Sequence, residues 1–478
     1  MFQAIVNIFK IPELRNKVLF TIAMLAVYRV GFWIPVPGVD QESLTEFFQM
    51  QMETGGAFGR MAAFISVFSG GSFGQSTIFG LGIMPYISAA IIFQLLASAY
   101  EPIKKKQQEG PSGRQQIQEW TRYTTIALCI VQAIGWLTFI TQNNLVFEYW
   151  KGNPIWWIMA VTAMTAGTVF LMWLGEQIDK YGIGNGVSLI ITAGILASMP
   201  NAFMWVIQNS PIRDIGLFQA VFGAPAAGSE AQLSWMNVIF LAAAFFFVVA
   251  GAVLITVAQR RIPVQQAKHT RGRKVYGGER TYLPLRVNHG GVMPIIFASS
   301  IMIFPSVAFG MMQEAFAGSQ GFGADMANWL SRAFVMGEYP YVILYIGMVY
   351  FFSYFWTTVQ FNPEDMSKQL RDHGSFIPGL RPGPRTAEYL ETVMERITYV
   401  GAGFLSVIAV VPMVVNRSLN IDFVVAQFLG GTGLLIVVSV GLDFIQRIEA
   451  NLLMRNYAGF LGNADKGKSP RIRGPRGS

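Results

Sequence analysis

Ten long apolar stretches follow one another along the chain, and shorter polar segments separate them. A membrane-spanning helix needs about 20 consecutive, mostly apolar residues, and each stretch approaches that length. The predicted spans cover residues 18–37, 77–99, 123–141, 155–175, 185–207, 235–257, 289–311, 339–361, 396–416 and 423–445. The pattern therefore predicts an all-α integral membrane protein with ten transmembrane helices.

Two further apolar segments do not fit as spans. Residues 61–74 are too short and too rich in glycine to cross a bilayer. Residues 1–17 alternate apolar and polar positions like a helix that lies in the membrane interface. No small-residue cleavage site follows the first span, so we do not expect a cleavable signal peptide.

The composition supports the membrane assignment. Charged residues make up only 13% of the chain, whereas soluble domains carry about 25%. A soluble chain of 478 residues would form about three domains, whose surfaces so few charges could not cover. The single cysteine, Cys129, excludes a disulfide framework and a cysteine-rich metal site.

The distribution of lysine and arginine predicts the orientation. With the N-terminus inside, the inner segments carry 28 of the 35 cations and the outer segments carry five. Cytoplasmic loops are the ones enriched in these residues, so we expect both termini in the cytoplasm. The net charge of +8 then forms a basic surface on one side of the membrane.

Two inner loops carry more charged residues than are needed to orient the protein in the membrane. Residues 258–288 hold eight cations against one acid, Glu279, and residues 362–394 mix charges with glycine and proline. Long loops of this kind are often functional, and these would suit an anionic partner such as RNA or an acidic protein face. The alternative is that the cations only set the topology and contact lipid headgroups.

A short motif occurs in both halves of the chain. Residues 82–89 read GIMPYISA and residues 291–298 read GVMPIIFA, so five of eight positions are identical. These segments lie in the second span of the first five and in the second span of the last five, which run in opposite directions. The motif therefore indicates an inverted repeat of five helices, unless two apolar segments are similar by chance.

The sequence contains no convincing nucleotide-binding, metal-binding or catalytic motif. Residues 462–469 match a phosphate-loop pattern but lack the preceding strand and following helix that such a loop needs. His269, His289 and His373 lack metal-ligand spacing, and no Ser/His/Asp arrangement is recognisable. We expect no enzyme activity, metal or cofactor. Few carboxylates lie within the spans, which argues against an ion-coupled carrier; a secondary transporter of a small solute remains the alternative function.

Pairs of aliphatic residues recur at helical spacing in two spans. Ile83 and Ile87 are four residues apart, and Val187 and Ile191 repeat that spacing. Such pairs can pack against lipid or other helices, and they can also line a pore.

A series of short sequence blocks recurs along the chain in a characteristic order, at residues 28–31, 34–40, 68–71, 82–88, 173–178, 182–189, 283–288, 296–300, 361–363, 377–383 and 430–438. In sequence and in order, these blocks resemble those of the SecY family, the channel subunits of the bacterial protein translocase. The resemblance covers nearly the whole chain.

The resemblance implies a clamshell of two halves, in agreement with the repeat. Residues 1–180 would form the N-terminal half with spans one to four and a short plug helix at about 64–74. Residues 181–234 would supply span five and the hinge side, and residues 235–445 spans six to ten with the loops 258–288 and 362–394. Residues 446–478 would form a basic cytosolic tail.

The resemblance also implies a central protein-conducting channel of the general secretory pathway in the bacterial plasma (inner) membrane. It would pass unfolded preproteins across the bilayer and release signal sequences and membrane helices sideways into lipid, between spans two and three and spans seven and eight. The implied pore ring consists of Ile83, Ile87, Val187, Ile191, Ile296 and Ile436. The implied plug contains Phe64, Phe68, Ser69, Gly70, Gly71 and Phe73.

The partners implied by the resemblance are the small membrane subunits SecE and SecG, the motor ATPase SecA, the ribosome, preprotein substrates and the lipid bilayer. The motor or ribosome would dock on the inner loops. Arg381 stands in the family's Arg-Pro-Gly motif and would couple to that partner. The accompanying basic dock would contain Arg260, Arg261, Arg271, Arg273 and Lys274. The chain departs from the family at residues 41–67, which are longer than expected, and at Val187, where isoleucine is commoner.

Overall fold

The computed structural model describes most of the chain. The described residues are 11–53, 76–209, 235–266, 269–271, 274–276, 278, 280–316, 321–335, 337–419, 425 and 431–462.

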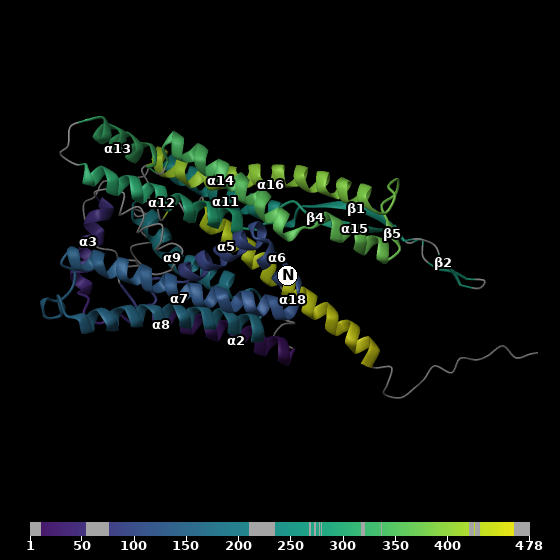
Figure 1. The fold of residues 1–478 in the computed structure, drawn as a ribbon, viewed down its shortest axis with the longest axis horizontal. Helices are drawn as coiled ribbons and strands as arrows, with labels where there is room; N and C mark the ends of the chain where they lie inside the picture. The colour runs from purple at the N-terminus through teal and green to yellow at the C-terminus, as the bar shows by residue number, and fades with distance from the viewer. Residues whose placement is uncertain are drawn as a thin grey trace, which may run out of the picture.

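A bundle of long helices forms the body of the molecule (Figure 1). Every predicted span overlaps one of them. They are α2 (Pro12–Gly31), α5 (Met84–Ala99), α7 (Pro111–Gln142), α8 (Pro154–Tyr181), α9 (Gly186–Gln208), α11 (Trp235–Val257), α12 (Met293–Ala315), α14 (Tyr339–Gln360), α16 (Pro384–Leu419) and α18 (Thr432–Gly462). Six helices in the described part of the chain are long and apolar enough to cross a membrane by those criteria alone. A multi-pass helical membrane protein is thus confirmed, and the count of ten spans stays a prediction.

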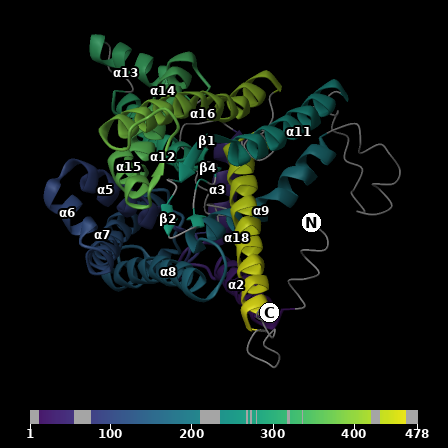
Figure 2. The same ribbon diagram turned by 90° about the vertical axis from the view of Figure 1, so that its right-hand side faces the viewer.

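Shorter elements lie at the ends of the bundle. Helices α3 (Gln41–Glu53) and α13 (Phe322–Ala333) lie at one end, and the strands lie at the other (Figure 1). Three more short elements are α6 (Glu101–Gln108), η2 (Glu148–Trp150) and α15 (Pro363–Asp372). The loops predicted to be cytoplasmic and the end of α18 therefore share one end of the molecule, which Figure 2 shows face on.

A small sheet joins the two long inner loops, and the sequence analysis did not predict it. Strands β1 (Gln259–Gln266), β4 (Arg280–Arg286) and β5 (Ser375–Phe376) pair antiparallel in the order β4-β1-β5. Gln259 is opposite Arg286, and Gln265 is opposite Phe376. A second pair, β2 (His269–Arg271) and β3 (Lys274–Tyr276), extends beyond it. The membrane part is all-helical as predicted, while loops 258–288 and 362–394 form one β-containing unit.

Two spans begin or end elsewhere than the hydropathy predicts. Helix α2 ends at Gly31, and the chain then turns so that Val36 N–H donates to the Ser76 carbonyl at 2.9 Å. Helix α5 begins only at Met84, although the apolar run begins at 77. Proline at the second position of α5 fits a helix start, because its missing N–H would have no partner there.

The internal repeat has a counterpart in the backbone. Gly82 and Gly291 have φ values of +58° and +59°, a region that glycine occupies without steric cost. Each glycine is followed two residues later by the first residue of a helix, Met84 or Met293, with proline second. The two copies of the motif therefore fold the same way where they enter α5 and α12.

Three larger apolar clusters hold the described elements together, with a small fourth one formed by Leu14, Ile183 and Ile448. The largest lies at the centre and joins α2, α5, α8, α9, α11, α12, α14, α16 and α18. A second packs α3 onto α7 and α8 through residues such as Leu44, Leu137 and Trp156. A third lies under the sheet and joins Ile262 and Leu285 to Ile377 and Leu390.

Candidate functional site

The six residues of the predicted pore ring come together in the central cluster. They arrive from four helices: Ile83 and Ile87 from the start of α5, Val187 and Ile191 from α9, Ile296 from α12 and Ile436 from α18. Five are buried, with at most 8% of their surface exposed, and Val187 is half-buried. The structure thus gathers residues up to 353 positions apart into one apolar cluster, and their role as a pore ring stays a prediction.

A cleft of about 350 Å³ opens beside this ring, at the end of the molecule that carries the strands. Its lining includes Ser188, Val292 and Val440. These residues lie three or four positions from Ile191, Ile296 and Ile436, which is one helical turn. Ile191, Ile296 and Ile436 therefore lie one turn deeper than the cleft, which we call the inner mouth.

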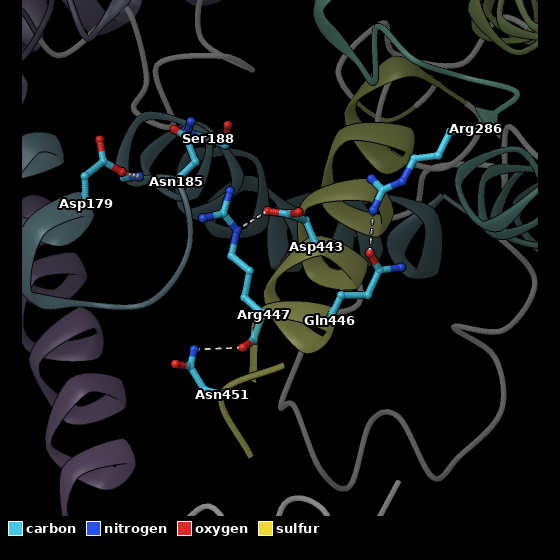
Figure 3. Close-up of polar contacts among 9 residues, drawn as sticks. Asp179, Asn185, Ser188, Arg286, Asp443, Gln446, Arg447 and Asn451 are labelled. Carbon is cyan, nitrogen blue, oxygen red and sulfur yellow. Dashed lines mark hydrogen bonds and ion pairs between the residues drawn. The ribbon is translucent and has the colours of Figure 1, made fainter. Parts of the chain in front are cut away.

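Polar side chains line the inner mouth. Arg447 Nε donates to Asp443 Oδ2 at 2.8 Å, one turn apart on α18. Arg286 on β4 donates from Nη2 to Gln446 Oε1 at 3.1 Å. Figure 3 shows Asp443 and Arg447 on the side of α18 that faces Asn185 and Ser188, and Gln446 on the side that faces Arg286. A cleft lined by charged and polar side chains thus lies one helical turn from three residues of the predicted ring.

The start of α9, which carries two ring residues, is fixed by hydrogen bonds and close packing. Asp179 on α8 accepts from the Gly186 N–H at 2.6 Å, and Asn185 accepts from the Ser188 N–H at 3.1 Å, as an N-cap does. A Cβ atom at Gly186 would lie 2.0 Å from the Gly175 carbonyl oxygen. Glycine is therefore required for α8 and α9 to approach this closely.

The predicted basic dock is only partly described. Arg260 and Arg261 are exposed on β1, and the third apolar cluster holds that strand in place through Ile262 and Val264. Arg271 and Lys274 are opposite each other across the β2–β3 pair, and their side chains lie outside the described part. Arg273 lies outside the described residues altogether.

Arg381 is exposed on a turn that is anchored from several directions. Its carbonyl accepts from Thr386 Oγ1 at 2.9 Å, and Ser367 on α15 donates to the Gly383 carbonyl at 2.8 Å. Leu380, next to it, packs against the cluster under the sheet. Because β5 follows β1 in that sheet, the Arg381 turn and the β1 arginines belong to one folded unit.

Two further predictions concern the plug and the absence of a metal site. The predicted plug residues Phe64, Phe68, Ser69, Gly70, Gly71 and Phe73 all lie outside it. Among the residues that the structure describes, no three or more His, Cys, Asp or Glu side chains gather as a metal would require.

The polar residues of the inner mouth were not predicted as a site from the sequence. Arg286 stands in one of the recognised blocks, and Asp443 lies near the inner end of the predicted span 423–445. Gln446 carried no signal, because its contact with Arg286 joins positions 160 residues apart.

Solved structures with this arrangement are protein-conducting channels. "The structure of a protein conducting channel" superposes with a TM-score of 0.57 at 17% identity, covering 95% of both chains. "The plug domain of the SecY protein stablizes the closed state of the translocation channel and maintains a membrane seal" gives 0.56 at 20% identity with the same coverage. "Sec61 in the Canine ribosome-channel complex from the endoplasmic reticulum" gives 0.53 at 17% identity, again over 95% of both chains. The fold is thus that of a protein-conducting membrane channel.

Sequence comparison narrows this class to one family. The family model SecY matches residues 77–445. The protein translocase subunit SecY of Thermotoga maritima is 39% identical over 477 residues and covers 100% of both chains. That of Halalkalibacterium halodurans is 40% identical over 470 residues, covering 96% of this chain and 100% of its own. The chain belongs to the SecY family. These similarities do not support the alternative of a small-solute transporter.

Proposed function

We propose that this chain is the central protein-conducting channel of a secretory translocase. It passes unfolded preproteins through the aliphatic ring and across the membrane. The observation that supports this proposal is that one central apolar cluster includes the six residues of the predicted ring: Ile83, Ile87, Val187, Ile191, Ile296 and Ile436. Three of them lie one helical turn from a cleft lined by polar side chains.

The chemistry of the ring suits a chain of any sequence. A narrow constriction of aliphatic side chains excludes water and ions when it is empty. When a polypeptide passes, the same side chains can pack around it without requiring a particular hydrogen-bond partner. The charged mouth keeps water at the inner side, so an unfolded chain stays hydrated until it reaches the constriction.

A sideways exit into lipid fits the packing of the helices. Helix α5 packs on α7, and α12 packs on α14, so each pair forms a unit. We place the exit for signal sequences and membrane helices between these two pairs. The segment 64–74 would act as the plug that closes the pore.

Energy for transport comes, in this proposal, from a partner docked on the sheet that unites the inner loops. Arg381, Arg260, Arg261, Arg271, Arg273 and Lys274 would contact a motor ATPase (SecA) or a ribosome. The known Sec61 structure is of a ribosome–channel complex, which supports a dock of this kind. The small subunits SecE and SecG would complete the complex, and the chain itself would catalyse no reaction.

The proposed location is the bacterial plasma membrane, with both termini in the cytoplasm. The units would be residues 1–180, the hinge side 181–234, the second half 235–445 and the basic tail 446–478. The shared end of the strands and α18 (Figure 1) supports this orientation, because β1 and β4 of loop 258–288, which holds eight cations, lie there.

Reconstitution tests this function. The full chain, purified with its co-purifying membrane subunits, is placed in liposomes with motor ATPase, ATP and an unfolded precursor. We expect the precursor to become protease-protected only when motor and ATP are both present. Uptake of a small solute by the chain alone, without any protected precursor, would contradict the proposal.

A further inference from the structure

Helix α13 buries its small residues and exposes its large apolar ones. Ala324, Ala327 and Ala333 are buried, whereas Phe322, Met326 and Trp329 are 82%, 47% and 64% exposed. The exposed three are spaced four and three residues apart, which places them on one side of the helix. Large apolar side chains gathered in a patch on a protein surface usually mark a contact with another phase or partner.

A polar stripe runs beside the apolar one. Asp325, Asn328 and Arg332 are all exposed, and their spacing of three and four residues also places them on one side of the helix. The exposed surface of α13 is thus divided lengthwise into an apolar half and a charged half. This division is typical of a helix that lies in a membrane interface.

Contacts with α12 hold α13 in a fixed position. Ser331 Oγ donates to Gln313 Oε1 on α12. Directly after α13, the ring of Phe334 lies 4.7 Å from that of Phe309 on α12. Both contacts lie at or just after the last turn of α13. They restrain rotation of the helix about its own axis, so the two stripes keep their directions.

The position of α13 indicates which phase covers its apolar stripe. The helix joins α12 to α14 at the end of the molecule opposite the strands (Figure 1), and Figure 2 shows it at the margin of the bundle. At the neighbouring start of α14, Tyr339 is 76% exposed and Ile343 is 51% exposed. Tryptophan and tyrosine are enriched where membrane meets water. Large exposed apolar side chains therefore occur both on α13 and at the start of α14, the next helix in the chain.

We propose that α13 is an interfacial anchor: Phe322, Met326 and Trp329 insert into the outer leaflet of the bilayer, and Asp325, Asn328 and Arg332 face the headgroups and water. The anchor fixes the outer end of α12, whose other end carries the ring residue Ile296. Lipid at this boundary thus helps to hold α12, and with it Ile296, in position.

Fluorescence quenching in vesicles tests the anchor. The chain has one cysteine, Cys129, which is buried, so Cys129→Ala provides a background for labelling. In that background Trp329→Cys and Phe322→Cys probe the apolar stripe, and Asn328→Cys is the matched control on the polar stripe. Each full-length variant, with its co-purifying subunits, is labelled with a polarity-sensitive dye. It is then reconstituted in phosphatidylethanolamine–phosphatidylglycerol vesicles and checked for precursor transport.

The anchor predicts opposite behaviour on the two stripes. At positions 329 and 322 the emission shifts to shorter wavelength and is lost to spin-labelled lipid, while iodide in the water has little effect. At position 328 iodide quenches and the lipid label does not. Iodide quenching at all three positions would overturn the proposal. So would protection of 329 and 322 from both quenchers, which would mean that a protein covers the stripe, and so would equal lipid quenching at all three. The second labelled position keeps the test decisive if one variant does not fold.

Discussion

Arg286 on strand β4 donates a hydrogen bond to Gln446 on helix α18 at 3.1 Å, although 160 positions separate them (Figure 3). The strand belongs to the sheet that carries the proposed dock. The helix carries the ring residue Ile436 ten positions earlier. One contact thus connects the surface where a motor would bind to an element of the constriction.

This contact predicts a measurable coupling. Removing either side chain, by Arg286→Ala or Gln446→Ala, should lower the rate of motor-driven precursor transport roughly fivefold, because a hydrogen bond of this kind contributes about 1 kcal/mol. The double variant should be no slower than either single variant. Arg280→Ala, at the exposed far end of β4, serves as the control and should leave the rate unchanged. Multiplicative losses in the double variant would mean that the two residues act independently.

Reversing the charge of Arg381 should stop export without unfolding the protein. Its side chain is exposed while the backbone around it is anchored, so Arg381→Glu should change the partner surface and little else. Export of a reporter precursor is measured in cells that depend on the variant, together with the amount of variant in the membrane. Arg385→Glu, an exposed arginine four residues further on, is the matched control. Normal export by Arg381→Glu would remove this residue from the dock.

A single added methyl group at Gly186 should destabilise the channel. The Cβ of Gly186→Ala would meet the Gly175 carbonyl oxygen at 2.0 Å, and overpacking of this kind costs about 1–3 kcal/mol. Thermal unfolding of the detergent-purified complex should occur at a lower temperature. Gly135→Ala on α7, where a Cβ meets nothing within 4 Å, should leave the unfolding temperature unchanged or raise it. Equal behaviour of the two variants would refute the close approach of α8 and α9.

The cap of α3 should respond to acid. Hydrogen bonds from the Ser43 hydroxyl at 2.7 Å and from the Ser43 and Glu42 N–H groups hold the pKa of Asp40 below its ordinary value. Its contribution to folding is therefore fully present above the ordinary aspartate value of about 3.9 and is lost as the pH falls through the lowered pKa.

Hydrogen exchange of the α3 amides checks this cap, with the wild type and Asp40→Asn compared at the same pH. Asparagine keeps a capping oxygen that does not titrate, so the wild type should lose protection relative to the variant only in acid. Glu46→Gln, an exposed position on α3, should behave as the wild type does. An unchanged difference across the pH range would show that Asp40 does not titrate with the cap.

Hydropathy and charge predicted most of the helical body, because spans and their orientation are local properties of the sequence. The ring residues Ile83 and Ile436 could be named only through the family resemblance, since spacing along one helix cannot distinguish pore from lipid. The sheet β4-β1-β5 was missed even though Ile262 and Val264 alternate with polar residues. Pro263 and Pro284 in that sheet weaken a strand pattern, and the pairing partners lie far apart in the sequence. The mouth residues Arg286 and Gln446 were missed for the same reason.

Cross-linking from a stalled chain tests the central claim most directly. Ile83→Cys and Ile296→Cys are made in the Cys129→Ala background, and a precursor with one cysteine is arrested during motor-driven transport. Both ring positions should form disulfides with the arrested chain, whereas Val131→Cys, which is 66% exposed on α7, should not. Cross-links at Val131 with none at the ring positions would show that the polypeptide does not pass through this constriction.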